Sequence, residues 1–111
     1  MHGMERPRFL ALADDVIGRV ENWLMDFDPD EVDFTSADGV IKIQFPDGRT
    51  YVLNRQTAAD QMWYAAGVRA WHYVWNEEKS AWHCDKDGHE LFDRVRMSLA
   101  DKLERHLEPI P

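Results

Sequence analysis

The sequence predicts an α+β fold, a two-layer sandwich in which two helices pack on one face of an antiparallel sheet of about six strands. Three observations predict it: an amphipathic segment near each end of the chain, alternating polar and apolar residues between them, and short turns containing glycine that interrupt the alternation. The order helix, strands, helix lets both helices bury their apolar stripes on the same sheet face. The opposite sheet face is therefore expected to meet solvent or partners.

The first helix is predicted from Pro7 to about Phe27, after a loose tail at residues 1–5. Pro7 suits the first turn of a helix. Pro29 ends the helix, because it lacks an amide hydrogen and keeps Asp28 away from helical angles. The apolar positions recur with a helical period and form one broad stripe: Phe9, Leu12, Ala13, Val16, Ile17, Val20, Trp23, Leu24 and Phe27.

Six strands are predicted at about residues 31–36, 40–45, 49–54, 61–65, 71–75 and 81–84. Side chains alternate across a strand, so placing Met62 and Tyr64 inward turns Gln61 and Trp63 outward. In the fifth strand the same rule places His72 and Val74 opposite the three aromatic residues.

The second helix is predicted from about His89 to Leu107. It follows a turn at residues 85–88. The stretch 85–90 has a weak similarity to a calcium loop, but it is too short for one and lacks the terminal acid at the required position. The helix stripe is Leu91, Phe92, Val95, Leu99, Leu103 and Leu107.

Length and charge limit the function classes. A chain of 111 residues predicts a single domain spanning 1–111, and a net charge of −8 argues against nucleic acid and for cations or a basic protein surface. The one cysteine excludes an internal disulfide and suits a reducing compartment. No apolar run reaches membrane-spanning length, and no signal-peptide core is recognised, so we expect a cytoplasmic protein without membrane partners. We expect a monomer, with metal-induced oligomers as an alternative.

Carboxylates gather along the first helix and continue past it into the first strand. They have a plain interpretation as a solvated, solubilising face, and a functional one as a cation site. Carboxylate oxygens suit Fe, Mn, Mg or Ca, whereas no Cys/His cluster that would suggest zinc is recognised. Nothing resembles a closed cage, so any affinity should be modest. These residues are here called the acidic ridge: Asp14, Asp15, Glu21, Asp26, Asp28, Asp30, Glu31 and Asp33.

Several other residues are candidates for contact or metal binding. An outward Trp63 between polar residues fits a protein-binding hot spot, although tryptophan is more often found in a core. His72 and His83 are expected on the outward face, where they could form a two-histidine metal or haem site or simply be solvated. Cys84 is expected to point inward beside Trp82 as a small apolar residue.

An enzyme is not favoured by the motifs. No Ser/His/Asp or Cys/His arrangement, glycine-rich phosphate loop or HExxH pattern is recognised. Oxidation of iron on the acidic ridge is the one reaction that the carboxylates suggest.

The acidic first helix, the Asp38-Gly39 turn, Asn54-Arg55-Gln56 and Gln61-Met62-Trp63 together resemble the frataxin family, most strongly its bacterial members, from Arg8 to about Leu107. The resemblance implies weak binding of iron (Fe²⁺ or Fe³⁺) on the acidic ridge, with other divalent cations able to substitute. It also implies a role in iron–sulfur cluster assembly, with a cysteine desulfurase and its scaffold protein as partners. The partner-binding residues expected are Asn54, Arg55, Gln56, Gln61, Trp63 and His72.

The helical part of the acidic ridge has fewer acids than the family pattern, because Asn22 and Met25 stand where family members often carry acids. Metal binding should then depend more on the acids from Asp26 onward. Two rival interpretations remain: an iron store or ferroxidase acting through the same carboxylates, and an acidic scaffold with no physiological metal.

Overall fold

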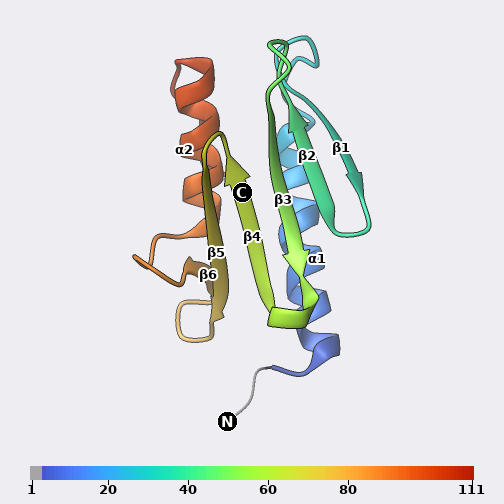
Figure 1. Cartoon of the computed structure of the whole chain (residues 1–111), viewed down its shortest axis with the longest axis vertical. Coiled ribbons are helices and arrows are strands. Elements are labelled where there is room, and N and C mark those ends of the chain that lie inside the picture. Colours follow the sequence, from blue (N-terminus) through green and yellow to red (C-terminus); the bar gives the residue numbers. More distant parts are fainter. Residues whose placement is uncertain (1–3) are drawn as a thin grey trace.

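The computed structural model describes residues 4–111, and within them it contains two α-helices, six strands and one short 3-10 helix (Figure 1). Of the loose tail expected at residues 1–5, residues 1–3 lie outside the described part, and Met4 packs against the hydrophobic core. The elements in chain order are α1 (Arg6–Leu24), β1 (Asp33–Ala37), β2 (Val40–Gln44), β3 (Thr50–Gln56), the 3-10 helix η1 (Thr57–Ala59), β4 (Gln61–Ala66), β5 (Arg69–Asn76), β6 (Ala81–Cys84) and α2 (Leu91–Leu103).

The six strands form one antiparallel meander in which each strand pairs with its neighbours in sequence. Figure 1 shows β2 and β3 passing in front of α1 and β5 passing in front of α2, so both helices lie on the same side of the sheet. The predicted two-layer α+β sandwich is confirmed. Its second sheet face carries no covering layer of described residues.

Strand alternation builds the core between the two layers. Met62 and Tyr64 are 0% and 1% exposed, as the predicted register of β4 requires. Tyr64 also hydrogen-bonds Ser98 of α2 through its hydroxyl, at 2.6 Å. The largest fully buried side chains come from both helices and from five of the strands: Phe9, Leu24, Ile41, Ile43, Leu53, Met62, Tyr64, Tyr73, Trp82, Leu91 and Leu99 among them.

Helix α1 ends three residues earlier than predicted, at Leu24 instead of Phe27. The next amides turn back more tightly, with Asp26 N donating to Trp23 O at 3.3 Å and Phe27 N donating to Leu24 O at 3.1 Å. These bonds span three residues, a common way for the end of a helix to satisfy its last carbonyls. Phe27 still reaches the core, where its ring packs edge-on against Trp23 at 5.0 Å between centroids.

Helix α2 is shorter than the predicted span of His89 to Leu107 at both ends. Glu90 is its N-cap, and the side chain accepts hydrogen bonds from the amides of Phe92 and Asp93, so the helix begins at Leu91. Glu104 adopts a left-handed conformation with φ of 56°, which ends the helix after Leu103.

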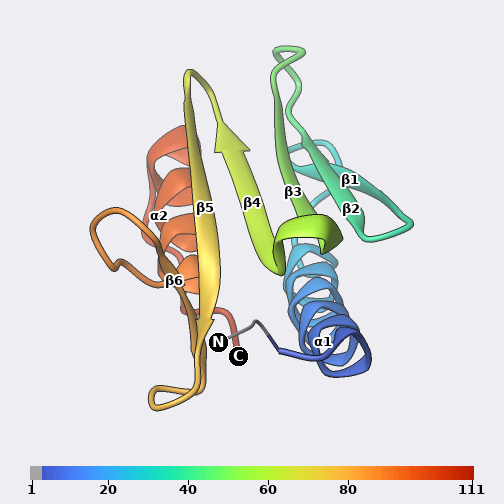
Figure 2. The ribbon, with the colours of Figure 1, turned by 60° about the horizontal axis from the view of Figure 1, so that its bottom comes forward.

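The C-terminal tail folds back onto the core instead of continuing α2. Leu107 and Ile110 are 5% and 8% exposed, and Arg19 Nε donates a hydrogen bond to Pro111 O at 2.9 Å. Figure 2 shows the C-terminal end lying between the two helices. The tail therefore fills part of the groove between α1 and α2.

Five of the six strands differ from the predicted bounds, β2 and β4 by one residue at their ends and the other three by up to two residues. β1 starts at Asp33 instead of residue 31, because Val32 N and Glu31 N both bond to Asp28 O in a turn. β3 continues to Gln56, so the Asn54-Arg55-Gln56 segment lies within the strand and does not close it. β5 extends beyond residues 71–75 to Arg69–Asn76.

Candidate metal-binding and partner-binding sites

The acidic ridge begins on α1, passes through the turn that follows, and ends at the first residue of β1. Asp14, Asp15 and Glu21 lie on α1, and Asp33 begins β1. The other four acids stand in the connecting turn, where Asp28 Oδ1 accepts a hydrogen bond from Asp30 N at 2.9 Å. Six of the eight side chains are exposed, and Glu21 and Glu31 are half-buried. The ridge is thus a surface band and not a pocket.

Three ridge carboxylates have a cationic partner. Asp14 pairs with Arg55 at 3.2 Å and Asp15 pairs with Arg19 at 3.3 Å. Glu31 pairs with Arg105, which comes from beyond the end of α2, at 2.6 Å. Two of these partners are remote in sequence, so the sequence alone gave no sign of them. The acids without an ion pair among residues 4–111 are Glu21, Asp26, Asp28, Asp30 and Asp33.

The ridge acids do not converge on a single point. Within the part of the chain that the structure describes, none of them belongs to a group of three ligand atoms lying within 4.8 Å of one another. A cation on this ridge would therefore be held by one or two carboxylates, with water completing its coordination. Such a site is weak and discriminates poorly among hard cations.

A shallow cavity of ≈450 Å³ lies beside the ridge, where the end of α1 meets the C-terminal tail. Apolar rings and prolines form most of its wall, and three ridge carboxylates and one arginine stand among them. The lining residues are Trp23, Asp26, Phe27, Asp28, Glu31, Arg105, Leu107, Glu108, Pro109 and Pro111.

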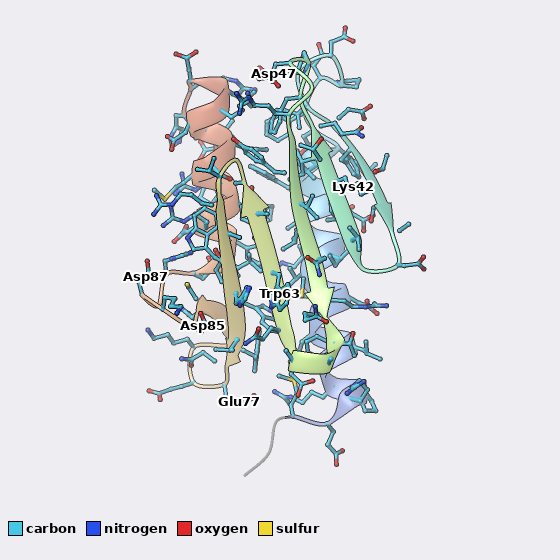
Figure 3. All side chains as sticks on the ribbon, viewed as in Figure 1. Lys42, Asp47, Trp63, Glu77, Asp85 and Asp87 are labelled. Atoms are coloured by element: carbon cyan, nitrogen blue, oxygen red, sulfur yellow. The ribbon has the colours of Figure 1, made fainter. Side chains whose placement is uncertain are left out.

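On the open sheet face, strand pairing places three of the expected partner-binding residues in one row. Asn54 of β3 pairs with Trp63 of β4, which pairs with His72 of β5. The next row toward η1 holds Gln56, opposite Gln61. Figure 3 shows Trp63 near the middle of the sheet, with Lys42 of β2 to one side.

Trp63 points outward as expected, but it is half-buried and not substantially exposed. Its ring stacks on His72, with centroids 4.2 Å apart and planes at 12°. Its Nε1 donates a hydrogen bond to Gln61 Oε1 at 2.8 Å. These two contacts fix the indole flat on the sheet, so it offers one ordered apolar surface framed by polar groups.

Arg55 is separated from the other expected partner-binding residues. Its neighbour across β4 is the buried Met62, so its side chain leaves the sheet on the helix side and reaches Asp14. It also runs close beneath Gly39, where an added Cβ would lie 2.6 Å from Arg55 Nε. Strand alternation explains the separation, because neighbours in sequence face opposite sides.

The two histidines expected on the outward face do not form a cluster with a third ligand among the described residues. His72 stacks on Trp63, and His83 Nδ1 lies 2.7 Å from the carbonyl oxygen of Gly88. Cys84 points inward and is 5% exposed, as expected.

The expectation that the chain has no Cys/His cluster is wrong. Cys84, Asp87 and His89 each offer one ligand atom, and these atoms lie within 4.8 Å of one another. Asp87 is exposed, and the amide and ring of His89 both hydrogen-bond its carboxylate, which lowers its pKa. The spacing Cys-x-x-Asp-x-His is the signal in the sequence, although the same residues are also typical of a turn.

A comparison with family models matches residues 2–105 to the Frataxin-like domain. The chain belongs to the frataxin family. The match spans both helices and all six strands of the structure.

Among related frataxins, the Iron-sulfur cluster assembly protein CyaY of Azotobacter vinelandii is 32% identical over 105 residues, covering 95% of this chain and 94% of the relative. The protein of the same name from Pseudomonas fluorescens strain Pf-5 is 33% identical over 105 residues, covering 91% and 94%. A solved frataxin structure from Psychromonas ingrahamii superposes with a TM-score of 0.83 over 95% of this chain and 97% of the other, at 21% identity. Neither helix within residues 4–111 is long and apolar enough to cross a membrane.

Proposed function

We propose that this frataxin is an adaptor of iron–sulfur cluster assembly that binds iron weakly through the acidic ridge and modulates a cysteine desulfurase. The names of its CyaY relatives, which are about one third identical along nearly the whole chain, support the assembly role. The protein would act as a monomer in the cytoplasm, where a reducing environment keeps Cys84 as a free thiol.

The observation that carries the adaptor role is the ordered indole ring of Trp63 on the uncovered sheet face. Tryptophan is enriched at binding hot spots because it buries a large rigid area at little entropic cost. Here the stack on His72 and the bond to Gln61 fix the ring before any partner arrives. The face would contact the desulfurase or the scaffold protein beside it.

The acidic ridge would contribute in two ways. Its unpaired carboxylates repel one another, so a bound Fe²⁺ or Fe³⁺ relieves that repulsion, and other divalent cations would substitute. The same negative charge would attract a basic patch on the desulfurase and speed association. Bridging of ridge carboxylates on two molecules by one cation would account for any metal-induced oligomers.

A second candidate, an iron store or ferroxidase, is favoured by the five ridge acids without an ion pair among the described residues. In that role iron uptake would follow the carboxylates, and Trp63 would have no effect. The two candidates therefore differ in what they expect from one side chain on the sheet.

The test measures cysteine desulfurase and cluster-assembly activity at saturating ferrous iron with Trp63→Ala. The adaptor predicts that the variant loses its effect on the desulfurase while it still binds iron. Met97→Ala is a matched control, because Met97 is apolar and 45% exposed but lies on α2, away from the sheet face. Wild-type behaviour of Trp63→Ala would favour the iron store. Pulldown from a cytoplasmic extract, with and without ferrous iron, identifies the partner directly.

A further inference from the structure

The loop between β6 and α2 gathers three potential metal ligands of different chemistry at the edge of the sheet. Cys84 ends β6, and Asp87 and His89 follow in the loop, with their ligand atoms within 4.8 Å of one another. Figure 3 shows Asp87 beyond β6, on the side of the molecule away from Lys42 and β2. Because β1 and β6 are opposite edges of the sheet, this cluster is separate from the acidic ridge.

Backbone hydrogen bonds hold the loop closed without any ion. Cys84 N donates to His89 O at 2.8 Å, and Gly88 N donates to Cys84 O at 3.1 Å. Gly88 supplies the left-handed backbone that this tight return requires, with φ of 80°. Asp87 Oδ1 accepts from His89 N at 3.1 Å. The three ligands are thus brought together by the fold, so an ion would not have to order them.

A buried tyrosine orients the histidine ring. Tyr73 is 0% exposed, and its hydroxyl lies 2.7 Å from His89 Nε2. This contact turns Nδ1 toward Asp87 Oδ1, at 2.5 Å. A metal-binding histidine commonly has its second ring nitrogen held by a partner of this kind.

We infer that Cys84, Asp87 and His89 bind a zinc-type divalent cation. One thiolate, one imidazole nitrogen and one carboxylate oxygen form a ligand set suited to Zn²⁺ or Co²⁺, whereas the oxygen-only ridge suits harder ions. Opening the 2.5 Å contact between Asp87 and His89 to admit the ion would let Nδ1 coordinate while Nε2–H donates to Tyr73. Because Asp87 is exposed, the fourth coordination position would face solvent.

The inference does not depend on the adaptor role, since it concerns other residues and another class of metal. The protein would then carry two metal sites, an oxygen-only ridge that prefers hard cations and a loop site that prefers Zn²⁺ or Co²⁺. We expect the loop site to bind Zn²⁺ in preference to Fe²⁺, because nitrogen and sulfur ligands bind Fe²⁺ more weakly than Co²⁺ or Zn²⁺.

Co²⁺ alone is the probe, added to the full chain with a non-thiol reductant. Bonding to Cys84 should produce a thiolate-to-cobalt charge-transfer band, and Zn²⁺ should displace it. Cys84→Ser should abolish the band. Tyr73→Phe should weaken Co²⁺ binding by about 10- to 100-fold through loss of the orienting hydroxyl. Acidification should weaken binding too, because the ligands must be deprotonated.

Variants at exposed positions guard against loss of folding. Asp87→Asn keeps an oxygen that can accept from His89 N but removes the charge, and it should lower Co²⁺ affinity at least tenfold. Asp85→Asn, an exposed acid of the same loop outside the cluster, should bind Co²⁺ like the wild type. Asp26→Asn/Asp28→Asn should keep the band as well, even if it abolishes iron binding. Absence of the band in the wild type, or equal affinity in Asp87→Asn and Asp85→Asn, overturns the site.

Discussion

Trp63 and His72 stack face to face across β4 and β5, with ring centroids 4.2 Å apart and ring planes at 12°. The stack covers one part of the indole and leaves the rest accessible on a sheet face that no described element covers. Trp63 thus contributes to the order of the open face and is also available to a partner. Its replacement should affect stability slightly and binding strongly.

Trp63→Ala and Tyr64→Ala should differ in stability although the residues are adjacent. Trp63 loses a stack and partial burial, about 1 to 2 kcal/mol, whereas the fully buried Tyr64 loses core packing, about 3 kcal/mol or more. Urea denaturation of both variants measures the difference. A larger loss for Trp63→Ala would mean that the two faces of β4 are exchanged.

Ridge acids without an ion pair among the described residues should destabilise the folded protein, whereas those with an ion pair should not. Replacing the unpaired Asp26, Asp28, Asp30 and Asp33 with Asn should raise the melting temperature without metal and remove most stabilisation by added cations. For one site at a hundredfold excess over the dissociation constant, that stabilisation is about 2.7 kcal/mol. The control is Glu31→Gln, which breaks the pair with Arg105 and should not stabilise. An unchanged iron response in the fourfold variant would place the iron ligands elsewhere.

Charge reversal in the ridge should affect how fast a complex forms. With Asp26→Lys/Asp30→Lys, association with a desulfurase should slow and lose much of its salt dependence, because long-range attraction is removed. Trp63→Ala should act mainly on dissociation and cost about 2 kcal/mol of binding. Stopped-flow association and surface-based dissociation rates at two ionic strengths distinguish the two effects. If both variants change only dissociation, the ridge does not steer the encounter.

Stability toward acid should depend on the contact between Asp47 and Lys102. The hydrogen bond from the Lys102 ammonium lowers the pKa of Asp47 below its usual 3.8. A lowered folded-state pKa stabilises the protein above the unfolded pKa, and this contribution is lost as pH falls through the folded pKa. Asp47→Asn should therefore lower the melting temperature at neutral pH. In strong acid the difference in melting temperature between this variant and the wild type should become smaller. Because the contact is exposed, high salt should also reduce that difference.

Gly39 should tolerate substitution less well than Gly48. Both have positive φ, 77° and 88°, so alanine is strained at either position. Only at Gly39 would the new Cβ meet the Arg55 side chain, at 2.6 to 2.8 Å, and push it from Asp14. We expect Gly48→Ala to cost about 1 kcal/mol and Gly39→Ala more. Thermal unfolding of both variants, repeated with Arg55→Ala, shows whether the excess depends on that contact.

Local rules predicted the layers of this fold because each depends on neighbours in sequence. Alternation placed Met62 and Tyr64 inside and Trp63 outside, and turn residues marked most strand ends. The same alternation places Arg55 on the helix face. This requires β3 to continue to Gln56, whereas the predicted strand ended at Asn54. The C-terminal end of α2 differs from the prediction because the apolar periodicity continues past Glu104, whose left-handed backbone is uncommon for a non-glycine residue.

Remote contacts account for what the sequence could not predict at the candidate sites. The pairs Asp14–Arg55 and Glu31–Arg105 join residues from different elements, so they follow only from the assembled fold. Asp87 and His89 are near Cys84 in sequence, but the Asp-Gly residues in this stretch predict a turn and do not by themselves indicate a ligand cluster. Their convergence depends on backbone bonds that bring His89 back alongside Cys84 and on Tyr73 of β5.

The uninterrupted meander has a consequence for the order of events during biosynthesis. Every strand pairing is local, so hairpins can form one after another as the chain leaves the ribosome. The core on the β4–β6 side, however, stays uncovered until α2 and the C-terminal tail emerge. The final step of folding should therefore follow the emergence of α2, and ribosome-bound chains stalled before Leu91 should expose apolar surface to chaperones.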